Sequence, residues 1–206
     1  MLFFDFSKIL DYFLKDVRIF ALEFIQPKPN EKILDVCCGT GEQVFYYSKK
    51  QALCFGIDYD EKSILKAKNR LKNKKNVFLK KADSTSLPFE DNYFDCASIC
   101  LALHEKTNDF QNKTIAEMKR VVKNKGKLIF IDFSAPLPNN FTTKTIKIIE
   151  YLAGKNHFSC FKNYLRQEGL TRLLNDNCLK KQRQTFLKND NLVIIEVINN
   201  KSDQKK

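Results

Sequence analysis

Three acidic residues and one glycine turn give the first half of the chain its chemical character. Asp35 precedes the turn LDVCCGTGEQ, Asp58 ends the next apolar segment, and Asp83 follows the third. Gly39 and Gly41 lie within the turn, where a missing Cβ lets a ligand approach the backbone closely. A helix that begins directly after such a turn presents free amides to a carboxylate or a phosphate. The pattern therefore predicts one binding site for a ligand that carries several polar groups.

The three acids suit different parts of such a ligand. Asp35 could take an ammonium group or tie the loop together, Asp58 suits a ribose, and Asp83 could accept a hydrogen bond from an exocyclic amine. Each acid alone has a plain structural alternative: Asp58 as a strand-end cap, and Asp83 as a cap of the Ser-Thr-Ser turn. Together they favour a shared ligand with an ammonium, a carboxylate, a ribose diol and an adenine amine. S-adenosylmethionine has all four groups.

Apolar segments alternate with helical patterns along most of the chain, which predicts an α/β fold. We expect a Rossmann-like, doubly wound, mostly parallel seven-stranded sheet whose edge is an antiparallel C-terminal hairpin. Ligands of such sheets bind at the carboxyl ends of the strands. Residues 1–206 are expected to form a single domain, with an N-terminal helical segment at 1–30 and a helical cap insertion at 134–160. Strands are expected at 32–37, 52–58, 76–80, 94–101 and 127–133, a hairpin within 182–199, and helices at 6–25, 42–49, 61–73, 109–122, 143–152 and 161–175. Gly169 is expected either to lie within the last of these helices or to end its first part.

Four stretches resemble the class I S-adenosylmethionine-dependent methyltransferases: LDVCCGTG, GIDYDEKSILKAK, KADSTSLPFEDNYFD and EMKRVVKNKGKLIFIDFSAP. The resemblance covers at least residues 32–133 and is nearest to the small-molecule branch that includes the quinone-biosynthesis methyltransferases. Cys37 departs from it by standing where the family usually has its first glycine. The nicotinamide dinucleotide fingerprint fails, because Val44 occupies the place of its third glycine.

The resemblance implies S-adenosylmethionine as the cofactor and assigns a role to each matching position. Asp58 is expected to bind the ribose hydroxyls, Tyr59 to pack on the adenine, and Asp83 to meet the adenine amine. The full set of expected cofactor-binding residues is Asp35, Cys37, Gly39, Thr40, Gly41, Asp58, Tyr59, Asp83, Ser84, Cys100 and Leu101.

His104 and Asp132 are the expected catalytic residues, because they follow or end the fourth and fifth strands near the expected methyl group. A carbon or phenol nucleophile needs a base, for which Glu105 is a further candidate. The alternative for His104 is a buried structural histidine. The Asn/Asp-Pro-Pro-aromatic tetrapeptide of amino-nucleobase methyltransferases is missing, since ICLALHE stands in its place. A small-molecule acceptor is therefore expected, and aromatic or quinone-like compounds are the candidates. Tyr151 and His157 in the cap are weaker candidates.

The formal net charge of +12 raises the question of an anionic partner. The basic residues are 30 lysines and only 6 arginines, whereas nucleic-acid readers rely on arginine. A lysine-rich solvated surface is favoured over a nucleic-acid interface. Two alternatives stay open: an RNA-associated methyltransferase, or a non-catalytic S-adenosylmethionine-binding protein. A nicotinamide-dependent oxidoreductase is a third reading.

Seven cysteines form no recognisable framework. The count is odd, no C-x-x-C pair occurs, and the two histidines are 53 residues apart. Neither a disulfide scaffold nor a metal site is predicted. Neither a signal peptide nor an apolar run long enough for a membrane span is recognised, so a cytoplasmic location is expected. The protein is expected to be a monomer or a homodimer.

Overall fold

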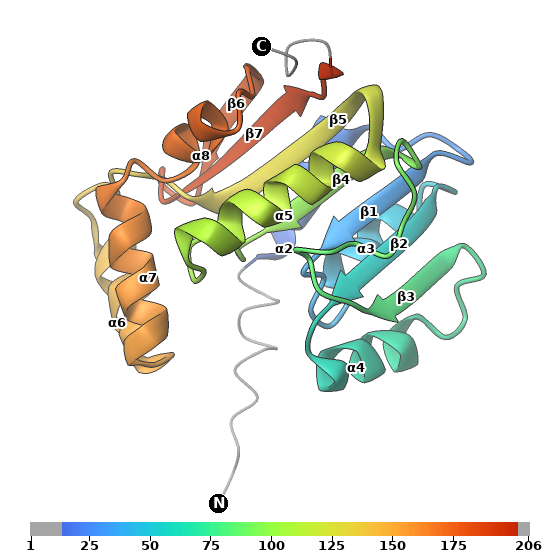
Figure 1. Cartoon of the computed structure of the whole chain (residues 1–206). Helices are drawn as coiled ribbons and strands as arrows, with labels where there is room; N and C mark the ends of the chain where they lie inside the picture. The colour runs from blue at the N-terminus through green and yellow to red at the C-terminus, as the bar shows by residue number, and fades with distance from the viewer. Residues whose placement is uncertain (1–13, 202–206) are drawn as a thin grey trace, which may run out of the picture.

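The computed structural model describes residues 14–201 and contains seven strands and seven helices within that range (Figure 1). The expected first helix begins outside the described residues. The strands are β1 (Lys32–Val36), β2 (Leu53–Asp58), β3 (Val77–Lys81), β4 (Phe94–Cys100), β5 (Val122–Phe133), β6 (Lys181–Leu187) and β7 (Leu192–Ile198). The helices are α2 (Lys15–Ile25), α3 (Glu42–Ser48), α4 (Glu61–Leu71), α5 (Asn108–Val121), α6 (Phe141–Leu152), α7 (Lys155–Arg166) and α8 (Leu170–Asp176).

The seven strands form one sheet in the order β3-β2-β1-β4-β5-β7-β6. The first five strands run parallel, and β7 pairs antiparallel with both β5 and β6. The strand order reverses between β1 and β4, which is the switch point where open α/β sheets bind ligands. The predicted doubly wound sheet with its antiparallel hairpin edge is confirmed.

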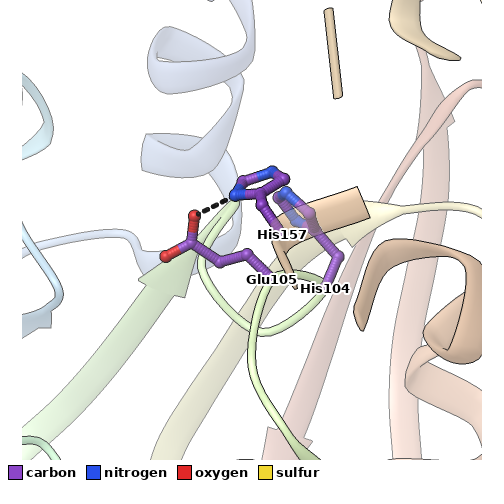
Figure 2. A group of neighbouring side chains, drawn as sticks. All are labelled: His104, Glu105 and His157. Carbon is purple, nitrogen blue, oxygen red and sulfur yellow. Dashed lines mark ion pairs between the residues drawn. The ribbon is translucent and has the colours of Figure 1, made fainter. Parts of the chain in front are cut away.

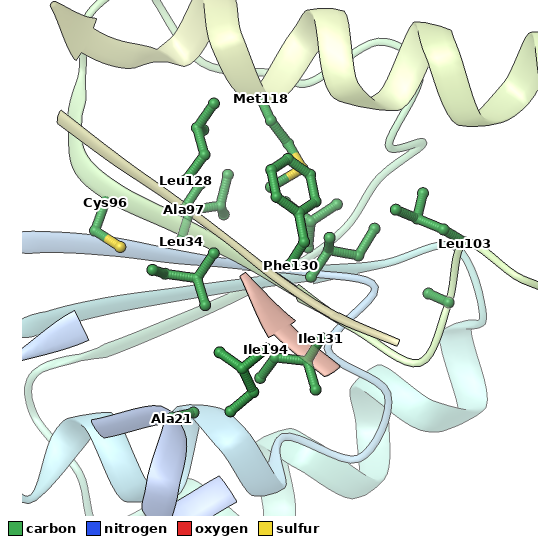
Figure 3. Close-up of a cluster of buried hydrophobic side chains, with 14 of the residues drawn as sticks. Ala21, Leu34, Cys96, Ala97, Leu103, Met118, Leu128, Phe130, Ile131 and Ile194 are labelled. Carbon is green, nitrogen blue, oxygen red and sulfur yellow. The ribbon is translucent and has the colours of Figure 1, made fainter. Parts of the chain in front are cut away.

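Apolar side chains on both faces of the sheet form the core. In Figure 3, Met118 of α5 lies over Leu128 and Phe130, while Ala21 of α2 lies on the other side, near Ile194. All five of these side chains are buried. The residues of β5 just before Leu128 are exposed or partly exposed. Burial on both faces explains why the parallel strands are continuous apolar runs in the sequence.

An aromatic cluster stands where a doubly wound fold usually has a helix. No helix joins β3 to β4, both of which lie in the described part of the chain. The connecting segment instead packs Phe89 and Tyr93 against Phe55 of β2, with ring centroids 6.1 and 5.8 Å apart. Phe78 stacks on the same Phe55 ring at 4.8 Å. This packing fixes the segment that carries Asp83 without a helix of its own.

Two expected boundaries differ from the structure. The fifth strand, expected to begin at residue 127, begins at Val122 because Asn199 after β7 holds this corner: its side-chain amide donates to the carbonyls of Lys119 and Val122 at 2.9 Å each. The helix expected to begin at residue 161 begins at Lys155, and of the two expected alternatives for Gly169, the end of its first part is the one observed: α7 ends at Arg166 and α8 begins at Leu170. Gly169 separates them with a φ of +56°, and a Cβ there would lie 2.9 Å from the Tyr164 ring. The early start of β5 therefore depends on a contact between distant segments.

A helical hairpin, α6 and α7, lies where the cap insertion is expected, and its second helix continues to Arg166, beyond the expected end at 160. Helices α6 and α7 lie together on the side of the molecule toward which the parallel strands point (Figure 1). Within residues 14–201, no helix has both the length and the apolar character needed to cross a membrane.

Gly56 in β2 sets how closely the glycine turn packs on the sheet. A Cβ at this position would lie 2.8 Å from Leu79, 2.9 Å from the Cys38 sulfur and 3.0 Å from Val44. We expect Gly56→Ala to lower the free energy of unfolding by about 1–3 kcal/mol, because three packed side chains must move. Urea denaturation measures this loss, and a variant as stable as the wild type would contradict the packing described.

Candidate functional site

The glycine turn after β1 has three residues in the left-handed region of backbone space. Their φ angles are +58° at Cys37, +53° at Gly39 and +78° at Gly41. A side chain at such a position costs about 1 kcal/mol relative to glycine. This conformation gives a physical reason why a glycine is usual where Cys37 stands. Leu101, directly after β4, is also left-handed with a φ of +51°.

Asp58 fastens the turn to the end of β2. Its Oδ2 accepts a hydrogen bond from the Gly39 amide at 2.8 Å, and its Oδ1 accepts one from the Asp60 amide at 2.9 Å. Each carboxylate oxygen can accept more than one hydrogen bond. The side chain therefore holds the turn and retains acceptor capacity toward a ligand.

Two cavities meet at this turn and share Cys37. The first, of about 210 Å³, has walls from β1, the turn and the end of β4. The second, of about 270 Å³, lies over the ends of β2 and β3. Of the expected cofactor residues, Asp35, Cys37, Gly39, Thr40, Cys100 and Leu101 line the first cavity, and Cys37, Asp58, Tyr59, Asp83 and Ser84 line the second. One expected binding residue, Gly41, lines neither.

The two glycines of the turn have different surroundings. A Cβ on Gly39 would meet no atom within 4 Å among the described residues other than its two chain neighbours. A Cβ on Gly41 would lie 3.0 Å from both Ala67 and Leu71 of α4. Gly39 therefore leaves open space beside the backbone, which fits a ligand cradle, whereas Gly41 lets α4 pack closely.

Asp83 and Ser84 both have structural partners as well as a place in the second cavity. The Asp83 Oδ1 accepts from the amide and the hydroxyl of Thr85, both at 2.8 Å. The turn-capping alternative for Asp83 is thus confirmed, and it does not conflict with a ligand contact. Ser84 is buried, and its hydroxyl lies 3.0 Å from that of Thr114.

Asp35 belongs to a buried hydrogen-bonded chain. The Ser98 hydroxyl donates to its Oδ1 at 2.9 Å and accepts from the Tyr47 hydroxyl at 3.0 Å. Burial raises the pKa of Asp35 to about 7, although Ser98 and the charge of Arg18 act in the opposite direction; the nearby Asp58 charge raises the pKa further. The first cavity therefore contains a carboxyl group that changes its charge near neutral pH.

This raised pKa predicts a pH dependence of stability. A carboxyl group whose pKa is near 7 when folded and near 3.8 when unfolded stabilises the fold fully below the unfolded value. That stabilisation is lost as the pH rises through about 7. Between pH 5 and pH 8, we expect the wild type to lose about 2 kcal/mol more unfolding free energy than Asp35→Asn, which cannot ionise. Urea denaturation of both proteins across this range tests it, and parallel curves would contradict the shift.

His104 and Asp132 lie next to the cavities, under the cap, and line neither of them. Asp132 accepts from the backbone amides of Leu103 and His104, and its Oδ1 lies 2.7 Å from His104 Nδ1. Asp132 thus orients His104 and shapes the loop after β4. Burial lowers the pKa of His104, but the carboxylates of Asp132 and Glu150 outweigh it and raise the value to about 10. A protonated imidazole cannot accept a proton, so these contacts do not support a base role; the catalytic assignments stay predictions.

The cap brings further ionisable groups to His104. The Nε2 of His104 is 3.5 Å from Glu150 Oε2 of α6, and the same oxygen lies 2.5 Å from His157 Nε2 of α7. His157 Nδ1 lies 3.2 Å from Glu105. Figure 2 shows His157 reaching from the cap toward Glu105 and His104 in the loop after β4. These side chains form a cluster only in the folded chain, because Glu150 and His157 are far in the sequence from His104 and Glu105.

The sequence prediction missed several residues that line the cavities. Arg18 of α2 borders the first cavity, and Lys106 and Phe110 border the second. Lys106 pairs with Glu105 at 2.7 Å. None of these residues belongs to a motif, and each enters the site from a helix or loop placed by the tertiary fold. Only the position of Lys106 and Phe110 soon after the fourth strand could have indicated them.

The cysteines of the turn are neutral packing residues. All seven cysteines of the chain are unpaired. Burial raises the pKa of Cys37 to about 12, and the nearby Asp58 charge adds to the rise. Burial likewise raises the pKa of Cys100 to about 12. These thiols remain protonated at neutral pH.

Strand order, switch point and turn define a Rossmann-like fold of the kind shared by S-adenosylmethionine-dependent methyltransferases. A SAM-dependent methyltransferase structure from Aquifex aeolicus has this fold, with a TM-score of 0.65, 20% identity and 88% of each chain covered.

Comparison of the sequences agrees with this class. Residues 33–126 match the family model described as a methyltransferase domain. The chain is 28% identical over 142 residues to the ubiquinone/menaquinone biosynthesis C-methyltransferase UbiE of Cupriavidus metallidurans, which covers 66% of this chain and 58% of that protein. It is 32% identical over 152 residues to a demethylmenaquinone methyltransferase of Bacillus cereus, covering 70% and 63%. The chain resembles class I S-adenosylmethionine-dependent methyltransferases, including these quinone-biosynthesis enzymes, and it spans less than two thirds of the length of either relative.

Proposed function

We propose that the chain is an S-adenosylmethionine-dependent methyltransferase that acts on a small-molecule acceptor. The single observation that carries the proposal is the pair of cavities that share Cys37 at the switch point of the sheet. The first is suited to the methionine part and the second to the adenosine part, because Asp58 stands at the second and Asp35 at the first. The open space beside Gly39 supports the same fit.

The chain's own residues would position the donor rather than activate it. Asp58 offers a carboxylate to ribose hydroxyls, and Asp83 and Tyr59 border the space for an adenine. Asp35 offers a carboxyl group near a cationic amine. A bound donor supplies an electrophilic methyl group on a sulfonium ion. The protein then contributes mainly by orienting donor and acceptor and by excluding water.

We propose an aromatic or quinone-like acceptor, in line with the names of the relatives. The cap supports this proposal by placing aromatic rings beside the end of β5. Phe133 and Phe161 have ring centroids 5.3 Å apart, and Phe158 lies 6.2 Å from Phe161. A cytoplasmic location and a monomeric or homodimeric state stay predictions from the sequence.

Methyl transfer from labelled S-adenosylmethionine to a demethylated naphthoquinol tests the acceptor class. We expect label in the quinol product with the wild type and none with Asp58→Ala. A protein that binds the donor but labels none of a panel of phenols, quinols and small amines would support the non-catalytic alternative. Labelling of RNA instead, with a steep dependence on salt, would support the RNA-associated alternative.

The acceptor-side assignment of His104 predicts a separation of two measurements. His104→Ala is expected to lower kcat by about 100-fold, the range of a lost positioning group, while the donor dissociation constant changes little. Calorimetry and turnover on the same preparation measure the two quantities. Because His104 is buried, His104→Gln serves as a variant of closer size. Wild-type turnover by both variants would remove His104 from the reaction.

A further inference from the structure

The strongest unassigned feature is the group of imidazoles and carboxylates between the cap and the sheet. Ligand atoms of His104, Glu105 and His157 all lie within 4.8 Å of one another. Glu150 of α6 adds a fourth group, because its Oε2 faces the Nε2 atoms of both histidines at 3.5 and 2.5 Å. Imidazole nitrogens and carboxylate oxygens in this number suit a divalent transition metal such as zinc.

The second nitrogen of each histidine is also occupied in a way typical of metal ligands. His104 Nδ1 lies 2.7 Å from Asp132, and His157 Nδ1 lies 3.2 Å from Glu105. Metal-binding histidines usually donate their other ring N–H to a carboxylate, which fixes the ring and its tautomer. With Asp132 and Glu105 in that role, both Nε2 atoms are aimed at Glu150.

The charge of the cluster leaves room for a cation. Glu150, Asp132 and Glu105 contribute three carboxylates, and Lys106 contributes one ammonium through its 2.7 Å contact with Glu105 Oε1. Imidazoles bind a metal in their neutral form, so the proton on His104 would leave when the metal binds. The group would then have a net charge of −2, which one divalent ion would balance. Burial of His104 and Glu150 makes such neutralisation worth more than at the surface.

We propose that His104, His157 and Glu150, supported by Glu105 and Asp132, form a binding site for one divalent transition-metal ion. His104 comes from the loop after β4, whereas Glu150 and His157 come from α6 and α7. A metal there would tie the cap to the carboxyl end of the sheet. The proposal does not depend on the methyltransferase function, and it gives His104 a role that excludes use of the same Nε2 as a base.

Zinc titration of the full chain, stripped of metal with a chelator and dialysed, tests this site by calorimetry. We expect one equivalent to bind. His157→Ala, whose side chain is partly exposed, and Glu150→Gln are each expected to weaken binding by about 100-fold. Glu90→Gln, a change at an exposed carboxylate, is the matched control and should bind as the wild type does.

Cobalt(II) substitution separates this site from a cysteine site. Ligation by imidazole and carboxylate gives a visible spectrum without the intense sulfur-to-cobalt charge-transfer band. Cys178→Ser, at the exposed cysteine, should leave both zinc affinity and the spectrum unchanged. A sulfur band, loss of binding in Cys178→Ser, unaltered affinity in both His157→Ala and Glu150→Gln, or no saturable binding at all would each overturn the proposal.

Discussion

Gly39→Val is expected to abolish binding of S-adenosylmethionine while the protein stays folded. The added side chain enters space that no described residue occupies, so it meets the ligand rather than the protein. The left-handed φ of +53° adds a stability cost of about 1–2 kcal/mol. Calorimetry measures the loss of binding, and urea denaturation measures the stability cost separately.

Gly154→Val is the matched control for this substitution. Gly154 also has a positive φ, of +124°, and its Cβ would likewise meet no described atom within 4 Å, but it lies between α6 and α7 and lines neither cavity of the turn. A similar loss of stability with retained donor binding is expected. Retained binding in Gly39→Val would show that the space beside the turn is not the donor site.

Asp58→Ala is expected to weaken donor binding by at least about 100-fold. Two hydrogen bonds from ribose hydroxyls to a charged carboxylate contribute about 3 kcal/mol or more, which corresponds to this factor. The substitution also removes the acceptor for the Gly39 amide, which lies 2.8 Å from Asp58 Oδ2, and so loosens the turn. Both effects act in the same direction, and calorimetry with the purified variant measures their sum.

Asp58→Asn separates the two contributions. The amide oxygen can still accept from the Gly39 amide, but the side chain has lost its charge and one acceptor atom. We expect an affinity between those of the wild type and Asp58→Ala. If both variants bind the donor as the wild type does, Asp58 serves only as a structural tie between β2 and the turn.

The fold could be predicted because its causes are local. A few consecutive residues are enough to indicate each element. Examples are the continuous apolar strands, the helical patterns between them and the turn KNDN near the C-terminus. The corner at Val122 could not be predicted in the same way. It depends on the Asn199 amide, which meets it only in the folded chain.

The cofactor side of the site was more predictable than the acceptor side. Asp35 and Asp58 end neighbouring parallel strands, so their sequence positions already place them at one edge of the sheet. Arg18 and Glu150 reach the site from helices whose docking no local pattern specifies. The same reason explains why a 53-residue separation of His104 and His157 argued against a metal site, although the fold places their ring centroids 5.7 Å apart.

We expect the acceptor side of the proposed site to depend on the cap. Glu150 and His157 connect α6 and α7 to the loop that follows β4, and this loop also borders the second cavity through Glu105. A change in the position of the cap would therefore reach the edge of the proposed donor site. Occupation of the proposed metal site is therefore expected to change the affinity for the donor.

Calorimetric titration of the full chain with S-adenosylmethionine tests the central claim most directly. We expect one saturable site with a dissociation constant of about micromolar order, which Gly39→Val removes and Gly154→Val retains. No saturable binding of S-adenosylmethionine, or equal binding by the wild type and Gly39→Val, would contradict the assignment of the glycine turn as its cradle.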